Sequence, residues 1–113
     1  NPHQPYIANG LLYIKVRARD SWKSLSKEFD ISRKKLRKYN DLYKGYELQE
    51  GDIVYLEKKN RKAGKEYVAH ELKAGESMHS VSQRYGIRLE RLYKMNRMKP
   101  EDEVRPGMIL RLR

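Results

Sequence analysis

The chain of 113 residues repeats itself at a constant offset of 56 residues, with no insertion. Identical residues recur at matched positions in the two halves: Ala18, Ser21, Ser24, Ser26, Ile31, Leu36, Lys38, Asn40, Glu47, Gly51, Ile53 and Leu56 return as Ala74, Ser77, Ser80, Ser82, Ile87, Leu92, Lys94, Asn96, Glu103, Gly107, Ile109 and Leu112. The repeat predicts two copies of one small module. Tandem units this short leave little room for an enclosed active site and are typical of multivalent binding.

The charge of the chain limits its partners. Lys and Arg number 26 against 15 Asp and Glu, so the net charge is +11. Such a surplus favours polyanionic surroundings: a nucleic acid, an anionic cell-envelope polymer or a membrane surface. The absence of cysteine excludes disulfides and thiolate metal sites. No apolar run approaches the roughly 18 residues of a membrane span. Because the chain starts at Asn1, we expect a piece of a longer protein whose targeting signal lies elsewhere.

Periodicity predicts the order strand, helix, helix, strand in each copy. In the first copy the strands are expected at 12–16 and 53–56, with one helix at 21–29 and another after Ser32. The second copy repeats this order at 68–72, 77–85, 89–95 and 109–112. Gly86 suits a left-handed helix end, and Asp30 takes that position in the first copy. Asn9-Gly10 predicts a hairpin turn that pairs residues 6–8 with 11–13.

These elements define the predicted architecture. The fold class is α+β, with two consecutive βααβ modules, each a two-stranded antiparallel sheet with two helices on one face. Residues 1–12 form an extension with an extra hairpin strand, and residues 13–57 form the first module. Residues 58–66 are expected to be a charged linker, and residues 67–113 the second module.

The same residues resemble a known family. The second copy combines "HELKAGESMHSVSQRYGIRLERLYKMN" with "VRPGMILRL", and is similar to a LysM domain in its helix start, its Tyr-Gly helix end, its final Asn and its Gly-containing last turn. The first copy matches through "DSW", "SLSKEF", "LRKYN" and "LQEGDIVYL". It departs at Arg19, where the family usually has glycine. The pair also resembles the C-terminal repeats of bacterial cell-wall hydrolases of the glucosaminidase or amidase type.

The resemblance implies a function and a site. LysM modules bind polymers that contain N-acetylglucosamine, such as peptidoglycan or chitin, in a shallow groove between the loop after the first strand and the loop after the second helix. Carried over by position, the glycan-binding candidates are Arg19, Asp20, Ser21, Trp22, Leu42, Tyr43 and Tyr46 in the first copy, and Gly75, Glu76, Ser77, Met78, Met98, Lys99 and Pro100 in the second. The resemblance further implies a monomeric, extracytoplasmic module of the cell envelope that anchors a larger protein, with no cofactor.

Residue chemistry is compatible with this interpretation. Tyr43 and Tyr46 offer flat faces to a sugar ring and hydroxyls to its rim, although a loop that folds over a thin core also needs aromatic residues. We interpret Trp22 mainly as a core residue, with a groove edge as the alternative. Asn40 and Asn96 are expected to stabilise turns. His70 and His79 have no metal-site spacing.

Other function classes are less compatible with the sequence. There is no cysteine nucleophile, G-x-S-x-G, HExxH or phosphate loop, and a carboxylate pair would need a cleft that this module hardly provides. Nucleic-acid binding is the main alternative, since tyrosines and basic residues could combine stacking with phosphate contacts. However, the basic "RKKLRK" of the first copy becomes the mixed "ERLYK" of the second, so nucleic acid is not expected. A protein-docking module without glycan binding remains open.

Overall fold

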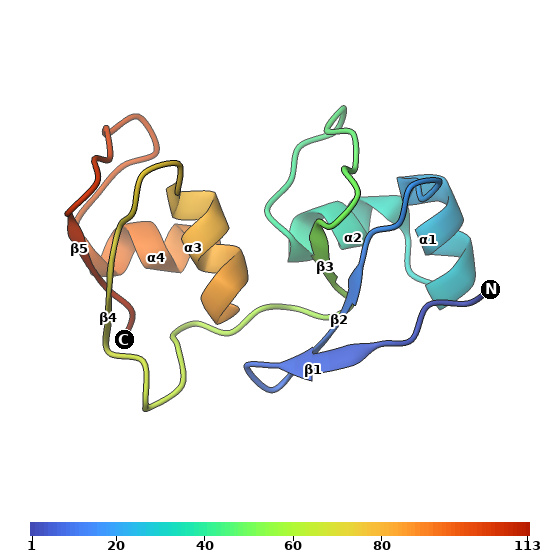
Figure 1. The fold of residues 1–113 in the computed structure, drawn as a ribbon, viewed down its shortest axis with the longest axis horizontal. Coiled ribbons are helices and arrows are strands. Elements are labelled where there is room, and N and C mark those ends of the chain that lie inside the picture. The colour runs from blue at the N-terminus through green and yellow to red at the C-terminus, as the bar shows by residue number, and fades with distance from the viewer. The chain divides into compact units, whose positions relative to one another are not determined.

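The computed structural model describes residues 1–113, which form two compact units, residues 1–59 and 60–113 (Figure 1). The first unit contains β1 (Tyr6–Ala8), β2 (Leu11–Lys15), α1 (Trp22–Phe29), α2 (Arg33–Tyr39) and β3 (Ile53–Tyr55). The second contains β4 (Ala69–Glu71), α3 (Met78–Tyr85), α4 (Leu89–Met95) and β5 (Ile109–Arg111). The α+β class and the two βααβ units are as predicted. No helix has both the length and the apolar character that a membrane crossing requires.

The first unit has a three-stranded antiparallel sheet in the order β1-β2-β3. Strand β1 pairs with β2 from Tyr6 opposite Tyr13 to Ala8 opposite Leu11. The hairpin turn places Asn9 at φ 56° and Gly10 at φ 73°, which is the backbone that Asn-Gly adopts in tight hairpins. The second unit has only the β4-β5 pair. The hairpin strand is therefore an addition to the first unit alone.

The first helix of each unit begins and ends where its capping residues predict. Ser21 and Ser77 each form a capping box with the serine three residues later. In each box the side chain of either serine accepts the backbone N–H of the other. Asp30 at φ 54° and Gly86 at φ 66° end α1 and α3 in the left-handed conformation. These caps fix the direction in which each first helix leaves the preceding loop.

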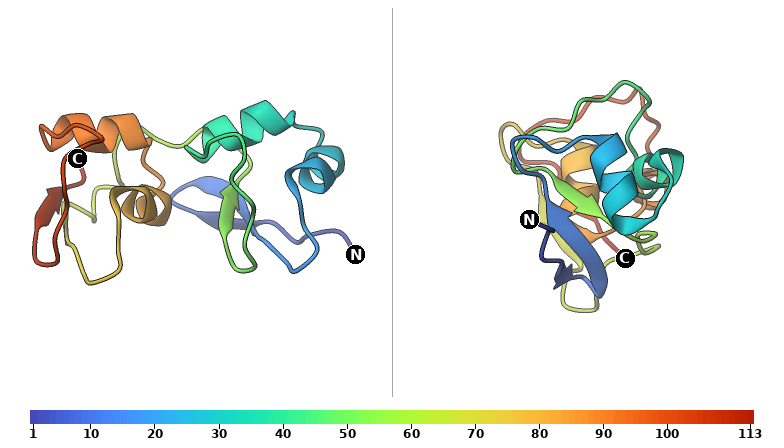
Figure 2. Two further views of the ribbon diagram at one scale, coloured as in Figure 1. Left: turned by 90° about the horizontal axis from the view of Figure 1, so that it is seen from above. Right: turned by 90° about the vertical axis from the view of Figure 1, so that its right-hand side faces the viewer.

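The first core lies between the helices and one face of the sheet, and the two helices lie on the same side of the strands (Figure 2, left). Ile14, Leu25, Leu36 and Val54 are each 0% exposed. The apolar positions spaced three and four apart on the helices therefore meet the inward positions of β2 and β3. Trp22 packs at the edge of this cluster.

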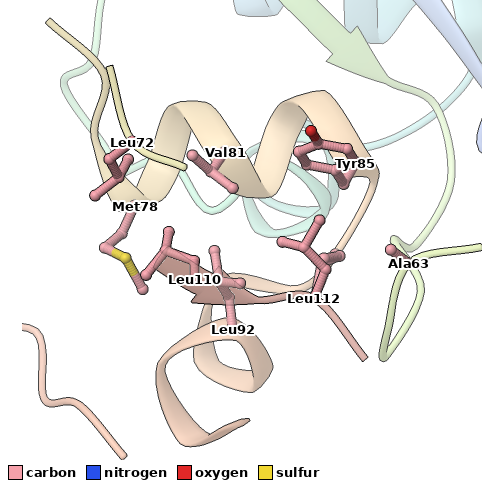
Figure 3. Packing of buried hydrophobic residues seen from close by; sticks show 9 residues of the cluster. Ala63, Leu72, Met78, Val81, Tyr85, Leu92, Leu110 and Leu112 are labelled. Atoms are coloured by element: carbon pink, nitrogen blue, oxygen red, sulfur yellow. The ribbon is translucent and has the colours of Figure 1, made fainter. Parts of the chain in front are cut away.

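The second core is larger and takes in a residue from before the repeat. Met78, Val81 and Tyr85 of α3 face Leu92 of α4 and the strand residues (Figure 3). The cluster consists of Ala63, Leu72, Met78, Val81, Tyr85, Ile87, Leu92, Leu110 and Leu112. Met78 is 3% exposed and its thioether turns inward beside Leu110 (Figure 3).

Residues 60–63 of the segment expected to be a charged linker are attached to the second unit. Asn60 forms a parallel bridge with Ile87, and its backbone bonds to Gly86 and Arg88 at 2.7 and 2.8 Å. Ala63 is buried and donates its N–H to Leu112 O at 2.8 Å. The structured part of the second unit thus begins at residue 60. Three backbone hydrogen bonds and one buried apolar side chain hold this segment, although most of the surrounding residues are charged.

Candidate functional site

Two loops of the first unit, at 18–22 and 41–47, are joined by one hydrogen bond. The indole Nε1 of Trp22 donates to the carbonyl oxygen of Tyr46 at 2.8 Å. Trp22 is half-buried and its ring packs against the core at the start of α1. Trp22 therefore acts as a core residue and also sets the position of the facing loop.

The facing loop presents two tyrosine rings. Tyr43 and Tyr46 meet edge to face, with centroids 5.9 Å apart and an interplanar angle of 84°. The turn between them is closed by a bond from Tyr46 N to Tyr43 O at 3.1 Å, with Gly45 at φ 110°. Tyr43 is 69% exposed, whereas Tyr46 is half-buried. One ring is therefore open to a ligand and the other supports it.

The hydroxyl of Tyr46 is already engaged inside the protein. It donates to Asp52 Oδ2 at 2.8 Å, and the same carboxylate oxygen accepts the N–H of Gln49 at 2.9 Å. Burial and this hydrogen bond to a carboxylate raise the pKa of Tyr46 to about 12. The phenol therefore stays neutral over the physiological range and holds the loop in place.

The acidic residue of the first turn has a structural role. Asp20 accepts the N–H of Arg17 at 2.6 Å, and its own N–H returns to Arg17 O at 3.0 Å. Its carboxylate also contacts His3 Nε2 at 2.6 Å. Ser21 caps α1. Both side chains are occupied by bonds within the unit, so this turn has mainly backbone groups to offer a ligand.

The second unit builds the same turn with different residues. Glu76 accepts the N–H of Lys73 at 2.7 Å and contacts His70 Nε2 at 2.9 Å. The hydrogen bond with His70 is the main cause that lowers the pKa of Glu76. His70 Nδ1 in turn lies 2.9 Å from the hydroxyl of Tyr85. Ser77 caps α3, as Ser21 caps α1.

The two turns differ at their third residue. Gly75 has φ 85°, as the third residue of a type II turn requires, whereas Arg19 is not among the residues with positive φ. Type I and type II turns differ by a flip of the peptide between their two central residues. The Ala74–Gly75 peptide therefore faces differently from the Ala18–Arg19 peptide. Arg19 itself is exposed.

The other loop of the second unit carries no aromatic ring. Lys99 and Pro100 are exposed in a turn where Lys99 N donates to Asp102 Oδ2 at 2.8 Å. Met98 is half-buried against the core, and Leu42, at the matching position of the first unit, is also half-buried. Met78 is 3% exposed and lies in the core, so its side chain offers no face to a ligand.

An asparagine anchors the base of this loop in each unit. Asn40 donates to Leu36 O and Tyr55 O at 2.8 and 3.0 Å, and accepts from Tyr55 N at 2.7 Å. Asn96 makes the same three bonds, to Leu92 O, Arg111 O and Arg111 N, at 2.8, 2.9 and 2.7 Å. The predicted structural role of both residues is confirmed.

Two supporting pairs were not predicted from the sequence. Asp41, which follows Asn40 at φ 54°, pairs with Lys59 Nζ at 2.7 Å, and the Lys59 side chain is fully buried. Burial lowers the pKa of Lys59, and the carboxylate of Asp41 opposes that shift. His3 is the other case, because it lies outside the repeat. The repeat at an offset of 56 residues identifies matched residues only inside the repeated segment, so it gives no signal for His3.

Comparisons with known proteins agree with the repeat. The sequence model of the LysM domain matches residues 14–56 and 70–113. Among curated proteins no significant match is found. A solved structure of the spore cortex-lytic enzyme SleL from Bacillus cereus is 23% identical, with a TM-score of 0.38, over 89% of this chain and 22% of that one. SleL from Bacillus megaterium QM B1551 is 21% identical, with a TM-score of 0.37, over 88% and 22%. The chain therefore spans 22% of the length of these two structures.

Proposed function

The chain belongs to the LysM domain family, and on that premise we propose that it is a pair of non-catalytic modules that bind a polymer containing N-acetylglucosamine, most simply peptidoglycan. LysM domains bind such polymers and are not themselves catalytic. In this proposal the pair anchors a larger extracytoplasmic protein of the cell envelope. Chitin is the alternative polymer, because it presents the same N-acetyl groups.

The observation that carries this proposal is the tyrosine platform of the first unit. Tyr43 is 69% exposed and is supported edge to face by Tyr46. Tyr46 is held at its carbonyl by Trp22 and at its hydroxyl by Asp52. Because Tyr46 supports it, the Tyr43 ring loses little freedom when it binds the apolar face of a sugar. The entropic cost of this contact is therefore small.

The occupied carboxylates support a neutral ligand at the loops. Asp20 and Glu76 are each bonded to a backbone N–H and a histidine. The loops therefore offer mainly backbone donors and acceptors, which match the amide of an N-acetyl group. Asp20, Ser21, Glu76 and Ser77 thus have a positioning role in the proposal, and Tyr43 has the direct contact.

A binding assay on insoluble polymer tests the proposal. We expect the chain to sediment with purified peptidoglycan and Tyr43→Ala to bind about three- to tenfold more weakly, as for the loss of one aromatic contact. Tyr6→Ala is the matched control, since Tyr6 is also an exposed tyrosine of the first unit, stacked on Tyr13 in the hairpin. Equal losses in the two variants would refute the role of the platform.

Salt separates sugar recognition from bulk charge. Binding through sugar contacts should persist at high salt, whereas binding of the +11 chain to a polyanion should fall steeply. Complete elution from both peptidoglycan and chitin at high salt would refute glycan binding and favour the alternative of a basic nucleic-acid-binding or protein-docking module.

The pair is also expected to bind long polymer more tightly than either unit alone. Simultaneous binding turns the second contact into an intramolecular event. A short oligosaccharide reaches one site only, so it should bind the pair and the better unit about equally. Residues 1–59 and 60–113 are the halves to compare with the full chain. Equal polymer affinity for the chain and one half would mean that one groove is inactive.

A further inference from the structure

The second unit has a hollow of about 530 Å³ whose charged lining is entirely basic. The segment before β4, helix α4 and the C-terminal residue form it. Its lining consists of Arg61, Lys62, Arg91, Lys94, Met95 and Arg113. The volume lies within the range of small-ligand pockets, and no acidic side chain is present to neutralise the five cations.

The five basic side chains also form no ion pair with a carboxylate outside the hollow. The ion pairs of the chain involve other residues, and none of these five side chains contacts a carboxylate within 4 Å. The one hydrogen bond recorded for them is from Arg113 Nη1 to the neutral carbonyl of Ala63, at 2.9 Å. Like charges gathered without counter-charge repel one another, and a bound anion would relieve that repulsion.

Arg91 contributes a guanidinium group to the lining of the hollow. Its Nε is shielded from solvent and has no hydrogen-bond partner, the only buried side-chain nitrogen or oxygen in this condition. Buried donors almost always have an acceptor. The Nη nitrogens of the same side chain are not shielded in this way, and the planar guanidinium fork suits an oxyanion in the hollow.

The hollow lies at the end of the sheet opposite the candidate groove loops. Leu72 and Met108 are bonded where β4 and β5 meet those loops, and Leu112 N bonds Val68 O at the other end. Arg113 follows Leu112, and the bond from Ala63 N to Leu112 O brings the 61–63 segment to the same place. Arg61, Lys62 and Arg113 therefore line the hollow from this far end of the sheet, while Lys94 and Met95 line it from the end of α4.

The full set of cations in this hollow is not repeated in the first unit. The residues 56 positions before Arg61, Lys62 and Arg113 are Pro5, Tyr6 and Glu57. Only the α4 cations have basic counterparts, Lys35 and Lys38. The first unit has a basic hollow of its own, of about 550 Å³, lined by Lys34, Arg37, Lys38, Leu42 and Lys44. Cations from residues 61 and 62 and from position 113 occur only in the second unit.

We propose that this hollow binds the phosphates of an anionic polymer that carries repeated phosphodiesters and no bases. Five cations in one place suit neighbouring phosphates better than a single carboxylate. The only non-basic lining residue is Met95, so no aromatic ring is present on which a base could stack. This site does not depend on glycan binding by the loops.

Titration of the full chain with two phosphodiester ligands tests the site. The probes are a glycerol phosphate oligomer and oligothymidylate with the same number of phosphates, at about 150 mM salt. We expect the glycerol phosphate oligomer to shift the Arg91 Nε–Hε signal and the amides of residues 91, 94 and 113 in NMR spectra. Tighter binding of oligothymidylate at the same residues would overturn the choice of ligand and favour nucleic acid.

Charge-matched variants decide whether the hollow or the bulk charge binds. Arg61→Gln combined with Lys94→Gln should weaken binding about tenfold, since each removes a charge-assisted contact. The control, Lys23→Gln with Lys27→Gln, removes equal charge from exposed positions of α1 and should change affinity less than about twofold. Arg91→Lys keeps the charge but loses the guanidinium fork, and should weaken binding about threefold or more. Equal losses in the two double variants, or no effect of Arg91→Lys, would overturn the proposal.

Discussion

Replacement of Asn40 by alanine should destabilise the first unit far more than the same change at Asn96 destabilises the second. The two residues make equivalent hydrogen bonds with nearly equal lengths. They differ in burial: Asn40 is 0% exposed, whereas Asn96 is half-buried and its partner Arg111 is exposed. The pair therefore isolates the effect of burial on one hydrogen-bond motif.

The expected magnitude follows from those contacts. Each hydrogen bond contributes about 1 kcal/mol net, and a buried group left without a partner costs about 1–3 kcal/mol. Asn40→Ala removes a hydrogen-bond partner from both the N–H and the C=O of the buried Tyr55, so we expect a loss of about 3–5 kcal/mol, close to the whole stability of a small unit. At Asn96 water can replace the amide, so a loss of about 1–2 kcal/mol is expected.

Urea denaturation measures both effects. Trp22 is the only tryptophan of the chain, so its fluorescence reports on the first unit alone. The second unit is followed through its backbone amides in NMR spectra of the same samples. Losses of equal size at Asn40 and Asn96 would refute the argument from burial. A large loss of stability for the Asn96 variant and a small one for the Asn40 variant would contradict the predicted order.

Three further predictions concern other residues. Leu36→Ala should cost the first unit about 2–5 kcal/mol, and the amide spectrum of the second unit should survive; loss of both spectra would show that the units are not independent. Because the pKa of Glu76 is lowered, its stabilising contact with His70 is present above the ordinary carboxyl pKa and is lost as pH falls through the lowered value. Glu76→Gln should therefore flatten the acid side of the stability curve, and an unchanged curve would contradict this. The pKa of Tyr46 is raised to about 12, so its contribution is present below about pH 10 and is lost as pH rises towards 12. Tyr46→Phe should reduce that alkaline loss, as measured by urea denaturation at several pH values.

Much of the fold could be predicted because it depends on local chemistry that the repeat presents twice. A serine that precedes an apolar stripe of helical spacing predicts a helix N-cap, as Ser21 and Ser77 do. The Asn9-Gly10 pair predicts its own hairpin turn. The burial of Leu36 and Leu92 follows from helical spacing alone. Such features require no knowledge of what lies across the core.

The features that escaped prediction depend on contacts between distant segments. Ala63 lies in a run of charged residues, and only its place beside Leu112 gives it a role in the core. The hydrogen bond from the Tyr46 hydroxyl to Asp52 could not be predicted for the same reason, because Asp52 lies across a loop whose path the sequence does not specify. The glycan contacts themselves stay a prediction, apart from Met78, whose place in the core withdraws it from the candidates.

The histidines that hold the two acidic turns come from different parts of the chain. His70 lies on β4, inside the repeated segment, whereas His3 reaches Asp20 and Glu28 from ahead of it. A module cut at the borders of the repeat would retain the first turn without its histidine, and a second module cut there would lack Ala63. A module that is to be expressed or fused on its own must therefore be longer than the repeated segment. Each copy has to include the residues that precede it.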